Sequence, residues 1–317
     1  MIKRIIIYTI TFVCILFVYR ALLYTGIKKN KAGIFNKYNE LFLKEGNTYD
    51  VLFLGSSRAE MHFNPMVFDS ITGLNSYNMG ISGASPNISL ALLKTYCQKH
   101  QKPKFIIFNV DYFWLQNDTD RLNDFPRYFP YLENSYLRNE LSKLDYRFNS
   151  FYFNPLHSLP YTQIDYLSAS LHGWLNISGR YDSLMHKGYQ TSELKNIESE
   201  NKSAPISGFI SPKNRADIDS LISFTKTNNI QLMLVTSPVL GNGNKQVSNK
   251  AVLSKNLKNI AIINHLPYYD YTDSLVYNSQ TLYADELHLN RHGALKFSQS
   301  ISLVFDNILS KKALFNK

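Results

Sequence analysis

Hydrophobic positions fall into one long run near the N-terminus and several short runs farther along the chain. Residues 5–27 are almost continuously apolar, whereas the later runs at 51–54, 105–108 and 231–238 are much shorter. Short runs that are apolar at successive positions are typical of strands buried on both faces of a sheet. An aromatic segment at 267–273 predicts a further short strand. The chain beyond the first run therefore contains at least four candidate strands.

Segments with helical spacing separate these strands. Helices are predicted at 89–100, at 211–229 after a Ser-Pro start, and at 247–265, and a helix start is predicted at Ser57. Near the C-terminus one helical face carries Ala294, Phe297, Ser298, Ile301, Phe305 and Ile308. Strands alternating with helices predict an α/β fold, a three-layer sandwich with a mainly parallel sheet covered by helices on both faces.

Residues 112–209 interrupt this alternation. The segment is dense in Tyr and Phe and is punctuated by prolines (Pro126, Pro130, Pro155 and Pro160). A connection of this length in a compact domain is usually structured, so we predict an inserted, partly helical cap over the carboxyl edge of the sheet. Its aromatic side chains either form the core of the cap or present faces that stack on sugar rings.

The first hydrophobic run is long enough to cross a hydrocarbon layer of ~30 Å as a helix. It lacks the small-residue motif of a signal-peptidase cleavage site, and it is hydrophobic all round rather than on one face. We therefore predict an uncleaved membrane anchor in residues 1–31, followed by the α/β domain in residues 32–317.

The net charge of +10 is concentrated in this anchor. Residues 1–31 hold six basic side chains and no acidic one, which leaves 28 basic and 24 acidic residues in the remainder. The remainder is only mildly basic, so charge gives no argument for a nucleic-acid partner. Both flanks of the apolar run are basic, and charge therefore does not decide the orientation of the helix.

Cysteine and histidine usage points to neither a disulfide nor a metal. Cys97 is the only cysteine outside the apolar run, and no Cys/His group has zinc-ligand spacing. Six further histidines are scattered and are expected to be surface or half-buried side chains: His62, His100, His157, His172, His186 and His265. We predict no cofactor and no metal.

Near the C-terminus, the sequence YADELHLNRHG places Asp285 three residues before His288. A carboxylate at that spacing can accept one ring N–H of the imidazole and leave the other nitrogen as a base. The same pair also occurs as a capping carboxylate beside a surface histidine. Catalysis by such a pair requires a nucleophile elsewhere in the chain.

A candidate nucleophile follows the first short strand, in the sequence VLFLGSSRAE. Gly55 predicts a tight turn, and Ser56 and Ser57 stand where a helix would begin, at the carboxyl edge of the sheet. Gly-Ser-Ser after a strand is also an ordinary turn and N-cap. The joint occurrence of both motifs is more specific than either alone and indicates acyl chemistry.

At these residues the chain resembles the SGNH/GDSL hydrolase superfamily, which has a flavodoxin-like three-layer fold. The nucleophile block corresponds to Gly55, Ser56 and Ser57, and a second block corresponds to Asn78, Gly80 and Gly83 in YNMGISGAS. The final block corresponds to Asp285, His288, Leu289, Asn290 and Gly293. The resemblance implies that Ser57 is the nucleophile, His288 the base and Asp285 its orienting carboxylate, with the Ser57 and Gly83 N–H groups in the oxyanion hole.

Two blocks depart from the family pattern. The residue before the nucleophile is Ser56 instead of Asp, and Arg58 follows. This Gly-Ser-Ser-Arg form resembles the membrane-anchored branch that includes alginate-type O-acetyltransferases and the D-alanyl transfer proteins of teichoic-acid modification. The third block is reduced to Asn109 and Asp111 after the strand at 105–108. Asn109 is either a third oxyanion donor or simply the residue that ends the strand.

The resemblance implies a membrane-anchored serine esterase or O-acyltransferase, with acetyl as the expected acyl group, that acts on a cell-envelope or exported polysaccharide. The expected partners are the membrane, a glycan or acyl-ester substrate and, for a transferase, a membrane protein that donates the acyl group. We expect the domain to lie outside the cytoplasm, in a bacterial periplasm or on the cell surface. The alternative is a catalytically silent scaffold or glycan-binding member of an envelope polysaccharide assembly.

Overall fold

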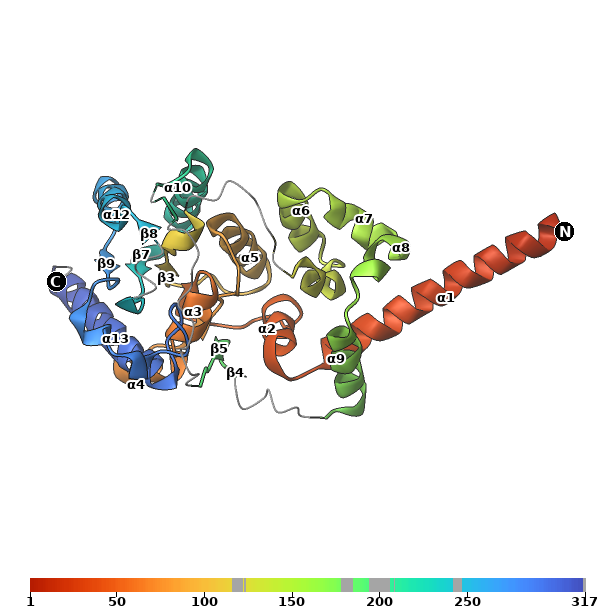
Figure 1. Ribbon diagram of the computed structural model, residues 1–317, viewed down its shortest axis with the longest axis horizontal. Helices are drawn as coiled ribbons and strands as arrows, with labels where there is room; N and C mark the ends of the chain where they lie inside the picture. The colour runs from red at the N-terminus through yellow and green to blue at the C-terminus, as the bar shows by residue number, and fades with distance from the viewer. Residues whose placement is uncertain are drawn as a thin grey trace. The chain divides into compact units, whose positions relative to one another are not determined.

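The computed structural model describes residues 1–115, 122, 124–177, 185–193, 206–207, 209–241 and 247–315. The chain divides into two compact units (Figure 1). The α/β unit comprises Gly46–Asn123 and Leu184–Lys317, and the helical unit comprises Met1–Glu45 and Asp124–Ser183. The predicted cap at 112–209 overlaps the helical unit over residues 124–183.

A five-stranded sheet forms the centre of the α/β unit. Its strands, in spatial order, are β2 (Ser76–Asn78), β1 (Val51–Leu54), β3 (Phe105–Asn109), β7 (Gln231–Thr236) and β9 (Tyr268–Asp270). Every neighbouring pair in this sheet is parallel, which confirms the predicted fold class. β2 was not predicted, because its three residues form no apolar run and only their parallel pairing with Val51–Phe53 of β1 makes them a strand.

Six α-helices follow the strands in this unit: α3 (Ser57–His62), α4 (Pro65–Thr72), α5 (Pro86–Lys99), α10 (Pro212–Thr227), α12 (Lys250–Asn264) and α13 (Arg291–Phe315), counted over the described residues. α3 begins at Ser57, as predicted. α12 is shorter than predicted, since Val247–Ser248 forms strand β8, which pairs with β6 (Ile206–Ser207). Short elements complete the unit: β4 (Met185–His186), β5 (Tyr189–Gln190) and the 3-10 turns η1 (Tyr112–Trp114), η5 (Leu275–Tyr277) and η6 (Gln280–Leu282).

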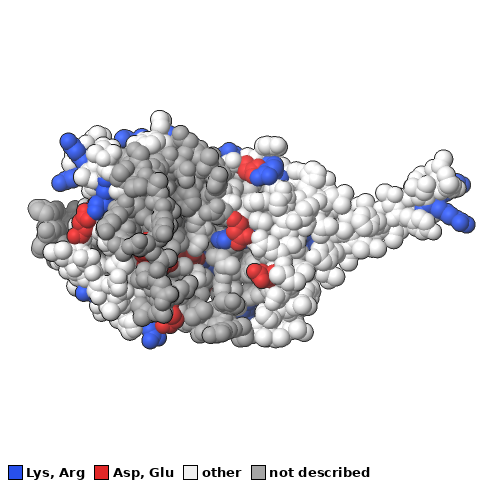
Figure 2. Space-filling view, in the orientation of Figure 1, with Lys and Arg blue, Asp and Glu red and all other residues white. Residues whose placement is uncertain are grey.

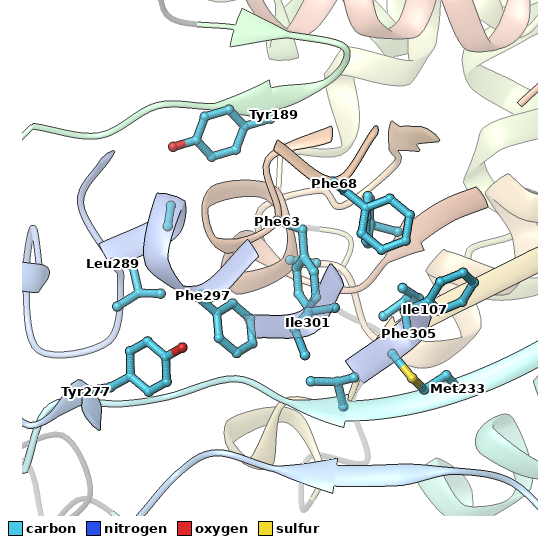
Figure 3. Close-up of a cluster of buried hydrophobic side chains, with 14 of the residues drawn as sticks. Phe63, Phe68, Ile107, Tyr189, Met233, Tyr277, Leu289, Phe297, Ile301 and Phe305 are labelled. Atoms are coloured by element: carbon cyan, nitrogen blue, oxygen red, sulfur yellow. The ribbon is translucent and has the colours of Figure 1, made fainter. Parts of the chain in front are cut away.

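The predicted apolar face of the last helix packs on the sheet. In α13, Phe297, Ile301 and Phe305 join Ile107 and Met233 in one buried cluster (Figure 3). Because side chains alternate along a strand, the intervening strand residues face the opposite side, where α5 and α10 pack together. Helices therefore cover both faces of the sheet (Figure 1).

The helical unit surrounds one end of the apolar N-terminal helix. Its elements are α1 (Ile2–Lys29), α2 (Gly33–Phe42), η2 (Phe125–Tyr131), α6 (Ser135–Leu144), α7 (Arg147–Phe153), α8 (Pro155–Ser158), η3 (Leu159–Tyr161) and α9 (Ile164–Leu175). α1 is long and apolar enough to cross a membrane, and only 6% of its most apolar 18-residue window is buried. Leu23 and Ile27 of α1 pack against Tyr166 and Ala169 of α9.

Candidate active site

The turn after β1 depends on Gly55. Its φ of +139° lies in a region that residues with a side chain rarely adopt, and an added Cβ would lie 2.8 Å from the Asn109 carbonyl oxygen. The chain thus leaves β1 close to the end of β3 and enters α3 directly. Ser56 is the N-cap of α3, where its Oγ accepts the Arg58 N–H at 3.3 Å, and Ser57 is the first helical residue.

The structure brings Ser57, His288 and Asp285 together in one hydrogen-bonded chain. Ser57 Oγ lies 2.8 Å from His288 Nε2. His288 Nδ1 lies 2.9 Å and 3.0 Å from the two carboxylate oxygens of Asp285. These distances lie within hydrogen-bonding range and have the order of nucleophile, base and orienting carboxylate.

The loop that carries His288 lies between η6 and α13 and is fixed by its own hydrogen bonds. Asp285 Oδ1 accepts the backbone N–H groups of Leu287 and His288, each at 2.9 Å. The Asn290 side chain donates to the carbonyl oxygens of Thr281 and Tyr283. Asp285 and His288 are therefore held in one turn, as their three-residue spacing predicted.

Two opposing effects set the charge of Asp285. Partial burial raises the pKa of its carboxyl group, but the hydrogen bond from His288 and those from the backbone lower it, and the net pKa lies below the ordinary value. Asp285 is therefore ionised at neutral pH and accepts the Nδ1–H of His288. We infer from this arrangement that Nε2 is the unprotonated nitrogen that faces Ser57.

Ser56 makes its side-chain hydrogen bonds with Asp111 and the start of α3, and not with His288. Its Oγ donates to Asp111 Oδ2 at 2.8 Å, and the same carboxylate pairs through Oδ1 with Arg58 at 3.3 Å. The Arg58 side chain is 1% exposed and also donates to the carbonyl oxygens of Ser237 and Pro238. Ser56 thus supports the turn, and Ser57 is the serine that faces the histidine.

The glycine-rich loop after β2 is fixed beside α3. The Ile81 N–H donates to the Gly55 carbonyl oxygen at 3.0 Å, and Glu60 Oε2 accepts both the N–H and the hydroxyl of Ser82. These bonds hold Gly83, with a φ of +78°, in the loop next to the Ser57 helix start. Within the described part of the chain, neither the Ser57 N–H nor the Gly83 N–H has a hydrogen-bond partner. Both are available for an oxyanion.

Asn109 ends β3 with its side chain buried. Its Oδ1 accepts the Ser237 N–H at 3.0 Å, while its Nδ2 has no surface exposure and no partner among the described groups. The structure thus places Asn109 beside Gly55, but its amide donor is enclosed. Its role as a third oxyanion donor remains a prediction.

One further histidine, His62, lies at the site and was not predicted there. His62 and His100 were expected to be surface or half-buried, and this is wrong: their exposed fractions are 0% and 6%. His62 ends α3, and its Nε2 accepts the Leu289 N–H at 3.0 Å. The five-residue spacing of Ser57 and His62 could have indicated that His62 lies near the site. Using that spacing would have required the length of α3, which the sequence did not predict.

Metal-ligating side chains do not gather in the described ranges. Within residues 1–115, 124–177, 185–193, 209–241 and 247–315, no group of three or more His, Cys, Asp or Glu side chains could hold a metal ion.

Comparisons with known proteins give structural similarity only. No protein-family model matches the chain, and no curated protein sequence matches it. A solved structure from Bacteroides fragilis, provisionally assigned as an acylhydrolase, is 16% identical, with a TM-score of 0.42 over 86% of this chain and 94% of that one. A GDSL-like lipase from Bacteroides thetaiotaomicron is 12% identical, with a TM-score of 0.42 over 86% of this chain and 97% of that one.

Proposed function

We propose that the α/β unit is a serine esterase or O-acyltransferase. The single observation that carries this proposal is the hydrogen-bonded chain from Ser57 through His288 to Asp285, with all contacts between 2.8 and 3.0 Å. The nucleophile and base are in contact, and the base is oriented by an ionised carboxylate, which is the arrangement that activates a serine hydroxyl. The proposal is also supported by the N–H groups of Ser57 and Gly83, which have no partner among the described residues and could donate to an oxyanion.

The proposed reaction has two half-reactions. Ser57 Oγ attacks the acyl carbonyl while His288 Nε2 takes its proton, and the resulting oxyanion accepts hydrogen bonds from the Ser57 and Gly83 N–H groups. His288 then protonates the departing alkoxide, which leaves an acyl ester on Ser57. In the second half, His288 removes a proton from water in an esterase, or from a sugar hydroxyl in a transferase, and the acceptor oxygen attacks the acyl carbonyl. The bond between the acyl carbon and Ser57 Oγ then breaks, and His288 returns the proton to Oγ.

The finer proposal is an O-acyltransferase, with acetyl as the expected group, acting on an envelope or exported polysaccharide outside the cytoplasm. It is supported by the apolar helix α1, which is long enough to anchor the chain in a membrane. It is also supported by the Gly-Ser-Ser-Arg block at Gly55–Arg58 and its resemblance to membrane-anchored O-acetyltransferases. A transferase would receive the acyl group from a membrane donor protein.

The experiment uses the full chain in detergent with p-nitrophenyl acetate and, separately, an alkyl phosphonate. We expect ester hydrolysis that Ser57→Ala and His288→Ala abolish, and a phosphonate adduct located on Ser57 by mass spectrometry. Ser56→Ala is the matched control, since Ser56 has the same chemistry but contacts Asp111, and it should retain much more activity than Ser57→Ala. Equal loss in both serine variants, or an adduct on another residue, would contradict the proposal.

Two further experiments test whether the chain is a transferase or an esterase, and whether the α/β unit lies outside the cytoplasm. If acetylated glycan forms at the expense of free acetate when an acceptor polysaccharide is added, the chain is a transferase; unchanged acetate release identifies an esterase. Protease accessibility of the α/β unit in intact cells, after outer-membrane permeabilisation where needed, tests the extracytoplasmic placement.

A silent scaffold or glycan-binding protein is the second candidate. The observation that favours it is the enclosed Nδ2 of Asn109, since loss of one oxyanion donor costs about 3 kcal/mol of transition-state stabilisation. A scaffold would bind glycan equally well before and after Ser57→Ala and would hydrolyse no ester.

A further inference from the structure

The uncharged part of α1 is shorter than a bilayer is thick. The stretch without charged side chains runs only from residue 5 to residue 19, between Arg4 and Arg20. At about 1.5 Å per residue this stretch is roughly 22 Å long, which is about 8 Å less than a hydrocarbon core of ~30 Å. A membrane-spanning α1 must therefore place about five further residues, 20–24, at or within the edge of the hydrocarbon.

Those further residues are the ones that contact the rest of the helical unit. Arg20 donates to the Tyr152 carbonyl oxygen at 2.8 Å, and the Leu23 side chain is 5% exposed because it packs on Tyr166 and Ala169. Figure 1 shows the first half of α1 projecting free, with α8 and α9 beside its second half. Parts of α7, α8 and α9 thus lie at the same depth in the membrane as the last turns of the membrane-crossing part of α1.

The contact between α1 and α9 is too close for the two helices to part easily. A Cβ added at Gly173 would lie 1.8 Å from the Gly26 carbonyl oxygen, and one added at Gly26 would lie 2.1 Å from Ser170 Oγ. Small residues that let two helix backbones meet in this way are typical of packing between membrane helices. The depth of α9 in the membrane is therefore set by the depth of α1.

The surface of α7–α9 is apolar where a water-exposed surface is normally charged. Residues 147–177, which begin with the first residue of α7, contain only two charged side chains, Arg147 and Asp165. Large apolar side chains in this segment are nevertheless exposed, among them Phe153 (67%), Ile164 (76%), Leu171 (60%) and Leu175 (64%). Soluble domains carry about 25% charged residues, so this composition fits contact with lipid better than contact with water.

Basic and aromatic side chains mark the polar limit of this surface. Lys29 Nζ lies 3.7 Å from the centre of the Trp174 ring, at the ends of α1 and α9. Lys28 pairs with Glu133 at 2.6 Å, and Lys31 follows. Tryptophan beside lysine is typical of the level of lipid headgroups. In Figure 2 the projecting part of α1 is white, with its blue side chains gathered at the free end, so the uncharged part of the helix lies between two basic ends.

From these observations we infer that the helical unit is partly embedded in the membrane, with the exposed apolar side chains of α7–α9 in contact with lipid at the hydrocarbon boundary. The occupant of this surface is the bilayer itself. The inference rests on α1 crossing that bilayer and is independent of the proposed enzymatic activity.

The test places a fluorophore whose emission reports polarity on single cysteines of the full chain in phosphatidylcholine vesicles. Every protein in the experiment carries Cys97→Ser, so that Cys97 is not labelled. The native Cys14 reports on α1, and Leu171→Cys and Phe153→Cys, each with Cys14→Ser, report on the helical unit. Ile262→Cys in α12 of the α/β unit, also with Cys14→Ser, is the matched control, since Ile262 and Leu171 are both 60% exposed. Circular dichroism checks that every variant keeps the thermal unfolding of the parent.

We expect labels at Cys14, Leu171→Cys and Phe153→Cys to shift their emission to the blue and to lose fluorescence to nitroxide-labelled lipids, and the label at Ile262→Cys to do neither. Quenching at Cys14 alone would overturn the inference and leave the anchor standing, and would favour a protein partner for this surface, because the vesicles contain none. Absence of quenching at all sites would show that α1 is not inserted and would overturn both.

Discussion

His62, the last residue of α3, accepts the backbone N–H of Leu289 through Nε2 at 3.0 Å. Ser57 is the first residue of the same helix, and Leu289 follows His288 directly, so this bond ties the loop of the candidate base to the helix of the candidate nucleophile. The His62 carbonyl oxygen also accepts the Ser298 hydroxyl of α13 at 3.2 Å. His62 makes these contacts from a fully buried position.

We predict that His62 acts as a positioning residue. His62→Ala leaves the Leu289 N–H without an acceptor, which costs about 1–3 kcal/mol of stability, and loosens the contact between Ser57 and His288. The turnover number should fall more than KM rises. His62→Gln offers an amide oxygen and should restore part of both losses. Esterase kinetics and calorimetric unfolding measure these effects, and equal activity in the alanine and parent proteins would contradict the role.

Protonation of His62 makes stability depend on pH. Burial, and after it the nearby Arg58 charge, hold the pKa of His62 well below 6.5 in the folded protein. The unfolded state therefore binds a proton below about pH 6.5 that the folded state refuses, so the free energy of unfolding falls as pH drops below that value. His62→Gln lacks this titration and should give a flatter profile of melting temperature against pH between about 6.5 and 4. Parallel profiles for the two proteins would refute the claim.

The sequence predicted the parts of this site that rest on local pattern. The spacing of Asp285 and His288, the serine after β1 and the buried face of α13 all follow from neighbours within a few residues, and the structure places them as expected. Their catalytic roles remain predictions. β2 and the burial of His62 were not predicted, because both depend on partners far along the chain, Val51 for β2 and Leu289 for His62.

The burial of Arg58 was not predicted either, because it also depends on partners far along the chain. A charged residue beside the nucleophile was expected to be a mark of one branch of a family, and nothing local indicated that its guanidinium would be buried. Its partners, Asp111 at the end of β3 and the carbonyl oxygens after β7, come together only when the parallel sheet forms. A buried charge and its long-range partner cannot be inferred from a single sequence without the sheet order.

We predict that Asp111→Ala is strongly destabilising. The change leaves the buried Arg58 guanidinium without its carboxylate and Ser56 without its acceptor, and breaking a buried pair in this way costs about 3–5 kcal/mol. The matched control is Asp219→Ala, which breaks the exposed Arg215–Asp219 pair at 2.9 Å and should cost at most about 1 kcal/mol. Thermal unfolding of the two variants measures the difference, and similar melting temperatures would disprove the structural importance of the buried pair.

Gly55 shapes the turn that presents the candidate nucleophile, Ser57. Gly55→Ala introduces a Cβ at 2.8 Å from the Asn109 carbonyl oxygen and 3.0 Å from Ala59 Cβ, at a φ of +139°. The backbone must move, and Ser57 moves with it relative to His288. Displacement of a reacting group by about 1 Å can cost roughly 10²-fold in rate, so we expect a loss of esterase activity of that order.

Gly73→Ala is the matched control for this turn. Gly73 also has a positive φ, +68°, but among the described residues, its two chain neighbours apart, no atom lies within 4 Å of an added Cβ. The substitution should cost about 1–2 kcal/mol of stability through backbone strain alone, with the activity of the folded protein unchanged. Both variants strain the backbone, and the close contacts of the added Cβ at Gly55 with Asn109 and Ala59 distinguish them. If the folded fractions of the two variants have equal activity, the position of Ser57 does not depend on the close approach of Gly55 to Asn109.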